Sequence, residues 1–365
     1  MNVCIIGEGL TALSLAKSLI NKKINVHYYH KSKNNNFSSN RTIGISKSNF
    51  EFFKKKIFQI SKNNHWKINR IEIYTDKIDK ENLLEFENDK NDLFYIIKNN
   101  ELLKSLKNNL SKSKFFKKII LKKDINEESL NKKEYDLIIN CDASNFLAKK
   151  YFTKKISKNY YNLAYTTILK HKKIENNTAT QIFTKQGPIA FLPISNIETS
   201  VVYSIDIKNK KKFDNSDVID LINKNNPKYK INKINKLNNF ELSSSNLRNY
   251  HHKNILAFGD MLHRVHPLAG QGFNMIIRDL SILTKLIEEK IELGIQLDSS
   301  ILDEFEKRTR DKNFVFSKAI DLIYESFNLD KKVQNKSFSK ILKGIGKNKN
   351  LNNYFIKLAD TGINF

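Results

Sequence analysis

The chain has 365 residues, of which 40% are hydrophobic, enough for one large folded domain or two interleaved ones. No apolar run approaches the roughly 20 residues that cross a bilayer, and no signal-peptide pattern precedes the first predicted strand, so we expect a cytoplasmic protein. Lys and Arg number 64 against 38 Asp and Glu, which gives a formal net charge of +26.

This positive charge is spread along the chain. Lysine is interleaved with asparagine, as in residues 31–36 and 208–212. A general bias toward Lys, Asn and Ile explains the pattern best. A basic face attracted to anionic lipid is the second interpretation, which would place the protein peripherally on an inner membrane. Nucleic-acid binding is the third, and we expect no such partner because zinc-finger spacing, a helix-turn-helix pattern and a compact basic tail are all missing from the sequence.

The N-terminal third predicts alternating strands and helices. Residues 2–6 form a strand pattern, 10–19 a helix and 24–29 a second strand, which is the opening unit of a Rossmann-like domain. A helical pattern at 101–110 precedes a buried strand at 136–141. Two cysteines in the strand-like runs are expected to be buried free thiols, and no metal site is predicted: Cys4 and Cys141.

The pattern changes after residue 158. Short strand-like runs, such as 189–194 and 200–205, alternate with turns and predict a mostly antiparallel layer. A buried strand returns at 254–258. A long helix is expected from about Gly272, and further amphipathic helices at about 299–327 and 335–360.

The motif GEGLTA joins the first strand to the first helix. Gly7 permits a tight turn, Gly9 lets the backbone approach a pyrophosphate, and the small Ala12 lets helix and strand pack closely. The N–H groups of the first helical turn, around Leu10 and Thr11, would then face the phosphates. The motif predicts dinucleotide binding.

The second strand ends in His30, where such a site usually has an acidic residue that binds the ribose hydroxyls. Imidazole can also form a hydrogen bond with a hydroxyl, so we expect His30 to contact the nucleotide.

Residues 259–274, GDMLHRVHPLAGQGFN, follow the strand at 254–258. This run resembles the GD…HP…GQG…N signature of the flavoprotein hydroxylases related to 4-hydroxybenzoate hydroxylase. Its HPxAGQGxN form is similar to the branch of that family that acts in ubiquinone biosynthesis. The resemblance implies an α/β fold with a Rossmann-like FAD-binding domain, an interleaved, mostly antiparallel β substrate domain, and C-terminal helices.

Within this motif, an aspartate at a strand end can accept hydrogen bonds from the ribityl chain of FAD. A helix N-terminus carries about half a positive charge and would stabilise the anion formed at the flavin's pyrimidine edge on reduction. Expected FAD contacts are Gly259, Asp260, Gly272, Phe273 and Asn274. The expected wall beside the reacting flavin edge is Pro267, Ala269, Gly270, Gln271 and Gly272.

The resemblance extends over most of the chain. Arg41, with residues 45–46, is similar to the family's arginine segment and is expected near the diphosphate or adenosine of FAD. Asp142 stands in the family's Asp-Gly motif, with Ala143 in place of glycine, and is expected to contact FAD and NAD(P)H. The GPxAxLP segment at residues 187–193 implies contacts with the substrate, as does the turn at Pro267. The expected substrate residues are Gly187, Pro188, Phe191, Pro193 and Pro267.

The resemblance also implies the domain limits. The FAD-binding domain takes residues 1–75, 95–155 and 250–295, the substrate layer 76–94 and 156–249, and the C-terminal helices 296–365.

The implied activity is hydroxylation of an aromatic ring, with a polyprenylated phenol of ubiquinone biosynthesis as substrate. NAD(P)H would reduce FAD, and O2 would give a flavin C4a-hydroperoxide that transfers the hydroxyl group. Other ubiquinone-biosynthesis proteins are expected partners. Two alternatives stay open: a related hydroxylase of a soluble aromatic, and a flavin-binding scaffold without turnover.

Overall fold

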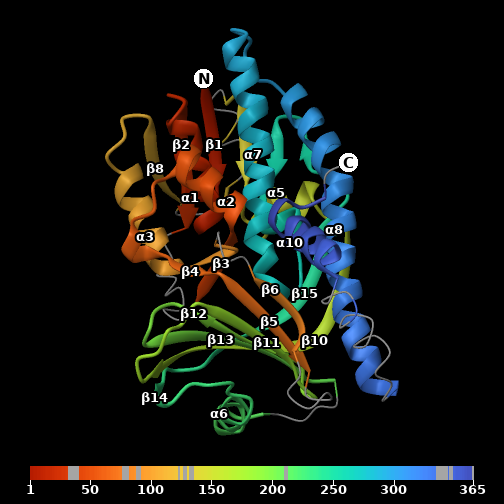
Figure 1. Cartoon of the computed structure of the whole chain (residues 1–365). Helices are drawn as coiled ribbons and strands as arrows, with labels where there is room; N and C mark the ends of the chain where they lie inside the picture. The colour runs from red at the N-terminus through yellow and green to blue at the C-terminus, as the bar shows by residue number, and fades with distance from the viewer. Residues whose placement is uncertain are drawn as a thin grey trace.

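The computed structural model describes residues 1–31, 41–75, 82–87, 92–121, 124–125, 130, 135–208, 213–333, 344 and 348–363. These residues form two large sheets, a small third sheet and the helices that connect and cover them (Figure 1). Parts of the two Lys/Asn runs lie outside the described residues, namely 32–36 and 209–212, and so does Asn40.

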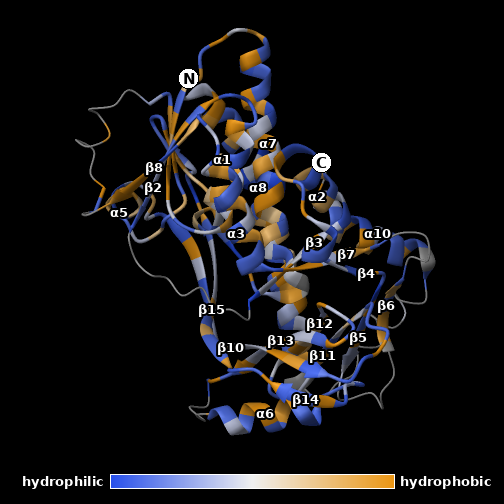
Figure 2. Ribbon diagram, turned by 90° about the vertical axis from the view of Figure 1, so that its left-hand side faces the viewer, coloured by the Kyte–Doolittle hydropathy of each residue, from blue (hydrophilic) through white to orange (hydrophobic). Residues whose placement is uncertain are grey.

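The first sheet carries the N-terminus. Its six strands are ordered β16 (His251–His252), β17 (Ile255–Ala257), β9 (Leu137–Asn140), β1 (Asn2–Ile6), β2 (Asn25–Lys31) and β8 (Phe116–Leu121). From β17 to β8 neighbouring strands are parallel, and β1 and β9 are buried almost throughout. Figure 2 shows hydrophobic residues along the strands at the centre of this sheet. Strands covered on both faces consist of continuous apolar runs, which is why the sequence predicted them.

The second sheet has nine strands. Eight of them follow the order β18 (His263–Arg264), β15 (Asn238–Leu247), β10 (Lys155–His171), β13 (Glu198–Asp206), β12 (Pro188–Pro193), β11 (Thr178–Phe183), β5 (Arg70–Thr75) and β6 (Asn82–Glu87). The ninth strand, β14 (Ile231–Ile234), pairs with β10. Every pair is antiparallel except β11 with β5. Helix α6 (Asn215–Lys224) covers the lower face in Figure 1, with Val218 and Ile222 buried against the sheet.

A small sheet lies between the two large ones (Figure 1). A three-stranded sheet is formed by β3 (Thr42–Ser46), β7 (Phe94–Lys98) and β4 (Trp66–Ile68). The shorter helices are α2 (Lys47–Phe52), η1 (Phe53–Ile57), η2 (Lys62–Asn64), α3 (Asn99–Leu110), α5 (Phe146–Tyr151), η3 (Gly259–Met261) and η4 (Leu268–Gly270).

Helix α1 (Leu10–Ile20) follows the first strand, and the longest described helices are α7 (Gln271–Glu292), α8 (Ser300–Val333) and α10 (Lys349–Thr361). The helix expected from Gly272 is α7, and its predicted apolar face, which includes Ile277, Leu280 and Leu283, is buried in the main core. Among the described residues, no helix combines the length and the apolarity that a membrane crossing requires.

The predicted α/β fold with a mostly antiparallel layer is confirmed. The structure places β5 in the nine-stranded sheet, although its residues fall at the end of the expected 1–75 segment. It also ends α8 at Val333, six residues after the expected end at 327. Of the helix expected at 335–360, the structure describes residues 344 and 348–360, and α10 lies there. The division into three domains stays a proposal.

Candidate functional site

The two glycine motifs meet at the carboxyl edge of the six-stranded sheet. Strands β1, β9 and β17 are parallel neighbours, so the residues that follow them lie together. A Cβ on Gly7 would lie 3.1 Å from the Cys141 carbonyl carbon, and a Cβ on Gly259 would lie 2.6 Å from Cγ2 of Thr11. The second motif therefore packs against the first through Gly259 and Thr11, while Gly7 packs against the end of β9.

The N-terminus of α1 opens from this edge. Gly9 caps the helix with φ 107°, and a Cβ there would meet no atom within 4 Å. The first N–H groups of a helix have no acceptor within it. Leu10 and Thr11 line the adjacent cavity, while Ala12 is fully buried against the sheet. This arrangement fits a dinucleotide phosphate that approaches the backbone at Gly9.

His30 lies at the end of β2, next to this helix. Its Nδ1 is 3.1 Å from the Lys31 carbonyl oxygen and 3.9 Å from the Glu8 carboxylate. Its Nε2 is buried and no residue that the structure describes forms a hydrogen bond with it. Burial lowers the pKa of His30 below its ordinary value, which favours the neutral form of the ring. A buried, unsatisfied nitrogen at this position fits a ribose hydroxyl.

The turn before α7 is held by its glycine and by one asparagine. Gly270 adopts the left-handed conformation, with φ 62°, and lies against Phe94 and Gly44 of the three-stranded sheet. Asn274 is fully buried, and its side-chain amide donates to the carbonyl oxygens of Gly44 and Gly270, each at 3.1 Å. Its carbonyl oxygen accepts from the Ser46 N–H at 2.9 Å. These bonds fix the turn relative to β3.

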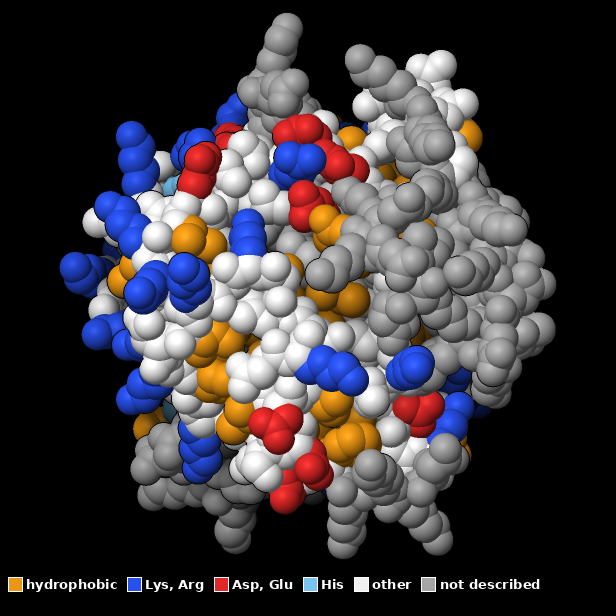
Figure 3. Space-filling model, turned by 60° about the horizontal axis from the view of Figure 1, so that its bottom comes forward, with side chains coloured by type: hydrophobic (Ala, Val, Ile, Leu, Met, Phe, Trp, Pro, Cys, Tyr) orange, Lys and Arg blue, Asp and Glu red, His pale blue; other side chains and the backbone are white. Residues whose placement is uncertain are grey.

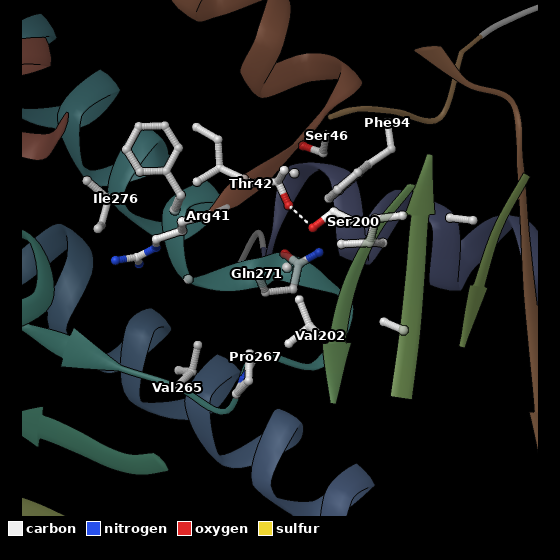
Figure 4. Close-up of a pocket in the computed structure, with 18 of the residues that line it drawn as sticks. Arg41, Thr42, Ser46, Phe94, Ser200, Val202, Val265, Pro267, Gln271 and Ile276 are labelled. Carbon is white, nitrogen blue, oxygen red and sulfur yellow. Dashed lines mark hydrogen bonds between the residues drawn. The ribbon is translucent and has the colours of Figure 1, made fainter. Parts of the chain in front are cut away.

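A cavity of about 1080 Å³ lies between the two large sheets, and residues of both glycine motifs line it. This lies at the upper end of the roughly 300–1,000 Å³ of typical ligand sites, which suits a ligand as large as a dinucleotide. Figure 4 shows Pro267 and Gln271 facing Ser200 and Val202 of β13, with the Thr42 hydroxyl directed at Ser200.

The floor of the cavity is one face of the nine-stranded sheet. Val202 pairs with Ala190 and Thr166, and Leu192 pairs with Ser200. The charged Glu241 lines the cavity from β15, at the margin of the floor, and is exposed. On β5, β6 and β10 to β13, the lining positions carry no charged side chain: Ile71, Ile73, Phe86, Thr166, Ala179, Thr180, Gln181, Ala190, Leu192, Ser200 and Val202. This central floor is largely apolar and suits an uncharged aromatic ring.

Four basic residues that the structure describes line the cavity, and none of them lies on the central strands of its floor: Arg41, Lys47, Arg264 and Lys357. Five carboxylates line the cavity as well: Glu8, Asp92, Glu241, Asp260 and Asp360. The lining as a whole is therefore not positively charged, and a countercharge for the diphosphate of FAD has to come from a single cation such as Arg41.

The structure brings many of the expected residues into this cavity. Those that line it are Gly9, Leu10, Thr11, Arg41, Asp260, Pro267, Gly270, Gln271, Gly272 and Phe273. Ala269 belongs to η4 in the same turn. The expected cofactor residues that do not line it are Gly7, Ala12, His30, Asp142, Gly259 and Asn274. Asp142 instead accepts hydrogen bonds from the N–H and hydroxyl of Ser144, at 2.8 and 2.7 Å.

The substrate segment requires a correction. Phe191 is fully buried in the cluster against α6, on the opposite face of the sheet, because alternate residues of a strand face opposite sides. Gly187, Pro188 and Pro193 also do not line the cavity. Gly187 forms a tight turn in which a Cβ would lie 2.0 Å from the Ser204 carbonyl oxygen. Ala190 and Leu192 provide the wall that the motif assigned to Phe191.

Two histidines of the second motif are buried beside the site. His263 lines the cavity, and its Nε2 lies 2.6 Å from the Asp279 carboxylate, which also accepts from Asn313 at 2.9 Å. His266 is stacked on Tyr324, and burial lowers its pKa to about 3. Among the described residues, no cluster of three His, Cys, Asp or Glu could hold a metal ion.

The family model described as an FAD binding domain matches residues 156–312, which include most of the cavity floor and the whole second motif. The curated relatives carry ubiquinone-biosynthesis names. The "Ubiquinone biosynthesis monooxygenase COQ6, mitochondrial" of Dictyostelium discoideum is 23% identical over 422 aligned residues, covering 89% of this chain and 84% of that protein. The "3-demethoxyubiquinol 3-hydroxylase" of Escherichia coli is 26% identical over 201 residues, or 53% of this chain. The chain spans about half the length of that protein and of the zebrafish COQ6, at 51% and 47%.

Solved structures share the fold at low identity. A variant of HpxO from Klebsiella pneumoniae, complexed with FAD, has a TM-score of 0.78 at 12% identity and 99% coverage of both chains. The p-nitrophenol 4-monooxygenase PnpA of Pseudomonas putida has a TM-score of 0.77 at 12% identity, covering 100% of this chain and 98% of that chain. The resemblance predicted from the motifs is thus confirmed: the chain is similar in sequence to ubiquinone-biosynthesis monooxygenases and has the fold of the FAD-dependent monooxygenases.

Proposed function

We propose that this protein is an FAD-dependent monooxygenase that hydroxylates an aromatic ring, and that its substrate is a polyprenylated phenol of ubiquinone biosynthesis. The observation that carries the proposal is the cavity that joins the Gly9 end of α1, the Pro267–Gly272 turn and the uncharged central floor of the nine-stranded sheet. A dinucleotide site and an apolar ring site thereby share one space. The names of the homologous proteins support the substrate class.

The residues present fit FAD. The diphosphate would lie at the N-terminus of α1 near Gly9, with Arg41 as a countercharge. Because Nδ1 of His30 donates to the Lys31 carbonyl oxygen, Nε2 of the neutral ring would accept a hydrogen bond from a ribose hydroxyl. Asp260 would accept from the ribityl hydroxyls. The N-terminus of α7, after Gly270, would lie near the pyrimidine edge, where its partial positive charge stabilises an anion. When bound, FAD supplies the chemistry of reduction by NAD(P)H and of oxygen activation.

The protein's own task is then to position the ring and exclude water. Val202, Ala190 and Leu192 provide a flat apolar floor, and Pro267 faces it across the cavity. An uncharged floor favours a neutral phenol over an aromatic carboxylate, because a buried carboxylate without a cationic partner is costly.

The first test is the visible spectrum of the purified protein, with chromatography of the chromophore released on denaturation. A two-band flavin spectrum and released FAD are expected. The second test measures NAD(P)H oxidation and incorporation of oxygen from labelled O2 into a prenylated phenol. Bound FAD without product from any phenol would favour the scaffold alternative, and a colourless protein that takes up no added FAD would overturn the proposal.

Membrane contact is a separate part of the proposal. On the face shown in Figure 3, Lys and Arg side chains gather along the left-hand side, with exposed hydrophobic side chains between them. Basic side chains near an anionic bilayer contribute about 1 kcal/mol each, so a net charge of +26 suits peripheral attachment. Flotation with liposomes that contain anionic lipid, compared with neutral liposomes, checks this. Equal binding to both would contradict it.

A further inference from the structure

Helix α10 lies across one side of the cavity and is attached at both ends. Near its start, the Asn352 side-chain amide donates to the Glu85 carbonyl oxygen of β6 at 2.6 Å. Near its end, the Asp360 carboxylate accepts from the N–H and the hydroxyl of Ser48 at 2.8 and 2.6 Å, and its carbonyl oxygen accepts from the Ser46 hydroxyl at 3.1 Å. The helix therefore joins the edge of the nine-stranded sheet to the start of α2.

The part of α10 between these attachments presents apolar side chains to the cavity. The helix rises about 12 Å from Asn352 to Asp360. Phe355, Ile356 and Ala359 line the cavity within this span. Two apolar residues of the same helix are exposed instead, at 44% for Leu351 and 62% for Tyr354. One helix thus has a cavity-facing apolar side and a distinct outer side.

Apolar residues from other elements line the same cavity. Phe86 of β6, Leu93 and Phe94 are among its wall residues, and Ile71 of β5 pairs with Phe86 in the sheet. Phe355 and Ile356 are only half-buried by the protein, so apolar surface of both faces the cavity space. An apolar ligand would remove this surface from water, and each buried methylene raises affinity about fourfold.

The charged residues of α10 that line the cavity do not interrupt this apolar surface. The Asp360 carboxylate is bound to Ser48. Lys357 is exposed, so its aliphatic stem can lie along the lining while its ammonium group stays in water. A ligand chain at Phe355 and Ile356 therefore meets mainly apolar atoms.

We propose that the space between α10 and β5–β6 is a subsite for the apolar tail of the substrate, with Phe355 and Ile356 as its specificity-determining side chains. This inference rests on the proposed function, in which the aromatic ring lies at Pro267 and Val202. An extended isoprenoid substituent matches a lined, apolar passage of this kind.

The test compares two phenols on the FAD-loaded protein: one without a substituent chain and one with a three-isoprene chain. The measured quantity is the ratio of their affinities, from titration calorimetry, and of their kcat/KM values. Wild-type protein is expected to favour the prenylated phenol at least a hundredfold. Ile356→Trp fills the subsite and is expected to reduce that ratio at least tenfold. Leu351→Trp places the same residue on the outer side of the same helix and is expected to keep the wild-type ratio.

A second variant, Ile356→Ala, keeps the test informative if the tryptophan variant does not fold. It shortens the wall and is expected to reduce the ratio about threefold to tenfold, with normal FAD content and an unchanged melting temperature within a few degrees. A ratio near one in wild-type protein, or equal ratios in wild type and both Ile356 variants, overturns the subsite. If the subsite fails in this way but the wild-type protein binds FAD and converts either phenol, the proposed function still stands. If the wild-type protein binds no FAD and converts neither phenol, the proposed function itself is overturned.

Discussion

The hydroxyl of Thr42 donates a 2.8 Å hydrogen bond to the hydroxyl of Ser200. Thr42 begins β3, which Asn274 ties to the turn before α7, and Ser200 belongs to the cavity floor on β13. This bond is a direct polar link between the proposed FAD side and the proposed substrate side of the cavity. It sets the distance between the proposed flavin position and the ring position.

Replacement of Thr42 by valine should loosen this link. Val keeps the shape of Thr but leaves the buried Ser200 hydroxyl without its donor, at a cost of about 1 kcal/mol in the free energy of unfolding. We expect kcat to fall severalfold with FAD content unchanged, because ring placement rather than cofactor binding is affected. Urea denaturation and steady-state kinetics measure both quantities. Thr42→Ser retains the hydroxyl and should behave like wild type; an equal loss in the serine variant would contradict the role of this bond.

The contact between Gly259 and Thr11 gives a second prediction. Gly259→Ala puts a Cβ 2.6 Å from Thr11 Cγ2 at a residue with φ +72°, so it combines a clash with backbone strain of about 1–2 kcal/mol. The variant should lose FAD and several degrees in melting temperature.

The double variant Gly259→Ala with Thr11→Ser removes Cγ2 and tests the clash alone. It should recover part of the FAD content measured by absorbance, while the strain at φ +72° persists. No recovery would show that strain, and not the contact with Thr11, accounts for the defect.

The fold was predictable because its signals are local. Apolar runs identified β1 and β9, the period of the buried face identified α7, and the scarce glycines marked the turns at Gly9 and Gly270. These features depend on residues within one element or one turn.

The cavity wall was less predictable. On β12, the motif indicated the strand but not which alternate residues face the cavity, so Phe191 was chosen in place of Ala190 and Leu192. Which alternate residues of a strand face the cavity depends on what packs against each face of the sheet. Helix α6 packs against the face that carries Phe191. The contribution of α10 depends on a pairing with Glu85 that is 267 residues distant in sequence, for which no local pattern exists.

His30 is expected to contribute one hydrogen bond to FAD. His30→Leu removes the unpartnered Nε2 at similar volume, and loss of one neutral hydrogen bond of about 1 kcal/mol should weaken FAD binding about fivefold. Fluorescence quenching of FAD on addition of apoprotein measures the Kd. His30→Gln keeps a hydrogen-bonding group and should lie closer to wild type. Unchanged affinity in His30→Leu would remove His30 from the nucleotide site.

Asp360→Ala should detach the end of α10. The Ser48 N–H and hydroxyl lose their acceptors, at a cost of about 1 kcal/mol because the site is largely exposed. We expect faster hydrogen exchange confined to residues 349–361, with protection of β1 and β9 unchanged, as followed by mass spectrometry. Asp220→Ala, on the exposed side of α6, is the matched control and should leave α10 protected. Uniform loss of protection over the whole chain would instead indicate global destabilisation.

His266 should make stability depend on acid pH. Its ring is 1% exposed between Tyr160 and Tyr324, and burial lowers its pKa to about 3, against about 6.5 in an unfolded chain. The unfolded state therefore binds a proton that the folded state does not. The contribution is fully present above about pH 6.5 and is lost as pH falls toward 3, by at most about 1.4 kcal/mol per pH unit.

His266→Phe keeps an aromatic ring between the two tyrosines but cannot be protonated. Between pH 7 and pH 5 its free energy of unfolding should fall by about 2 kcal/mol less than that of the wild type, from urea denaturation at each pH. The remaining acid dependence of the variant reports the other titrating groups, among them His30, whose pKa is also lowered by burial. Parallel pH profiles for the two proteins would mean that His266 is protonated in the folded state, and hence that water or a carboxylate reaches its ring.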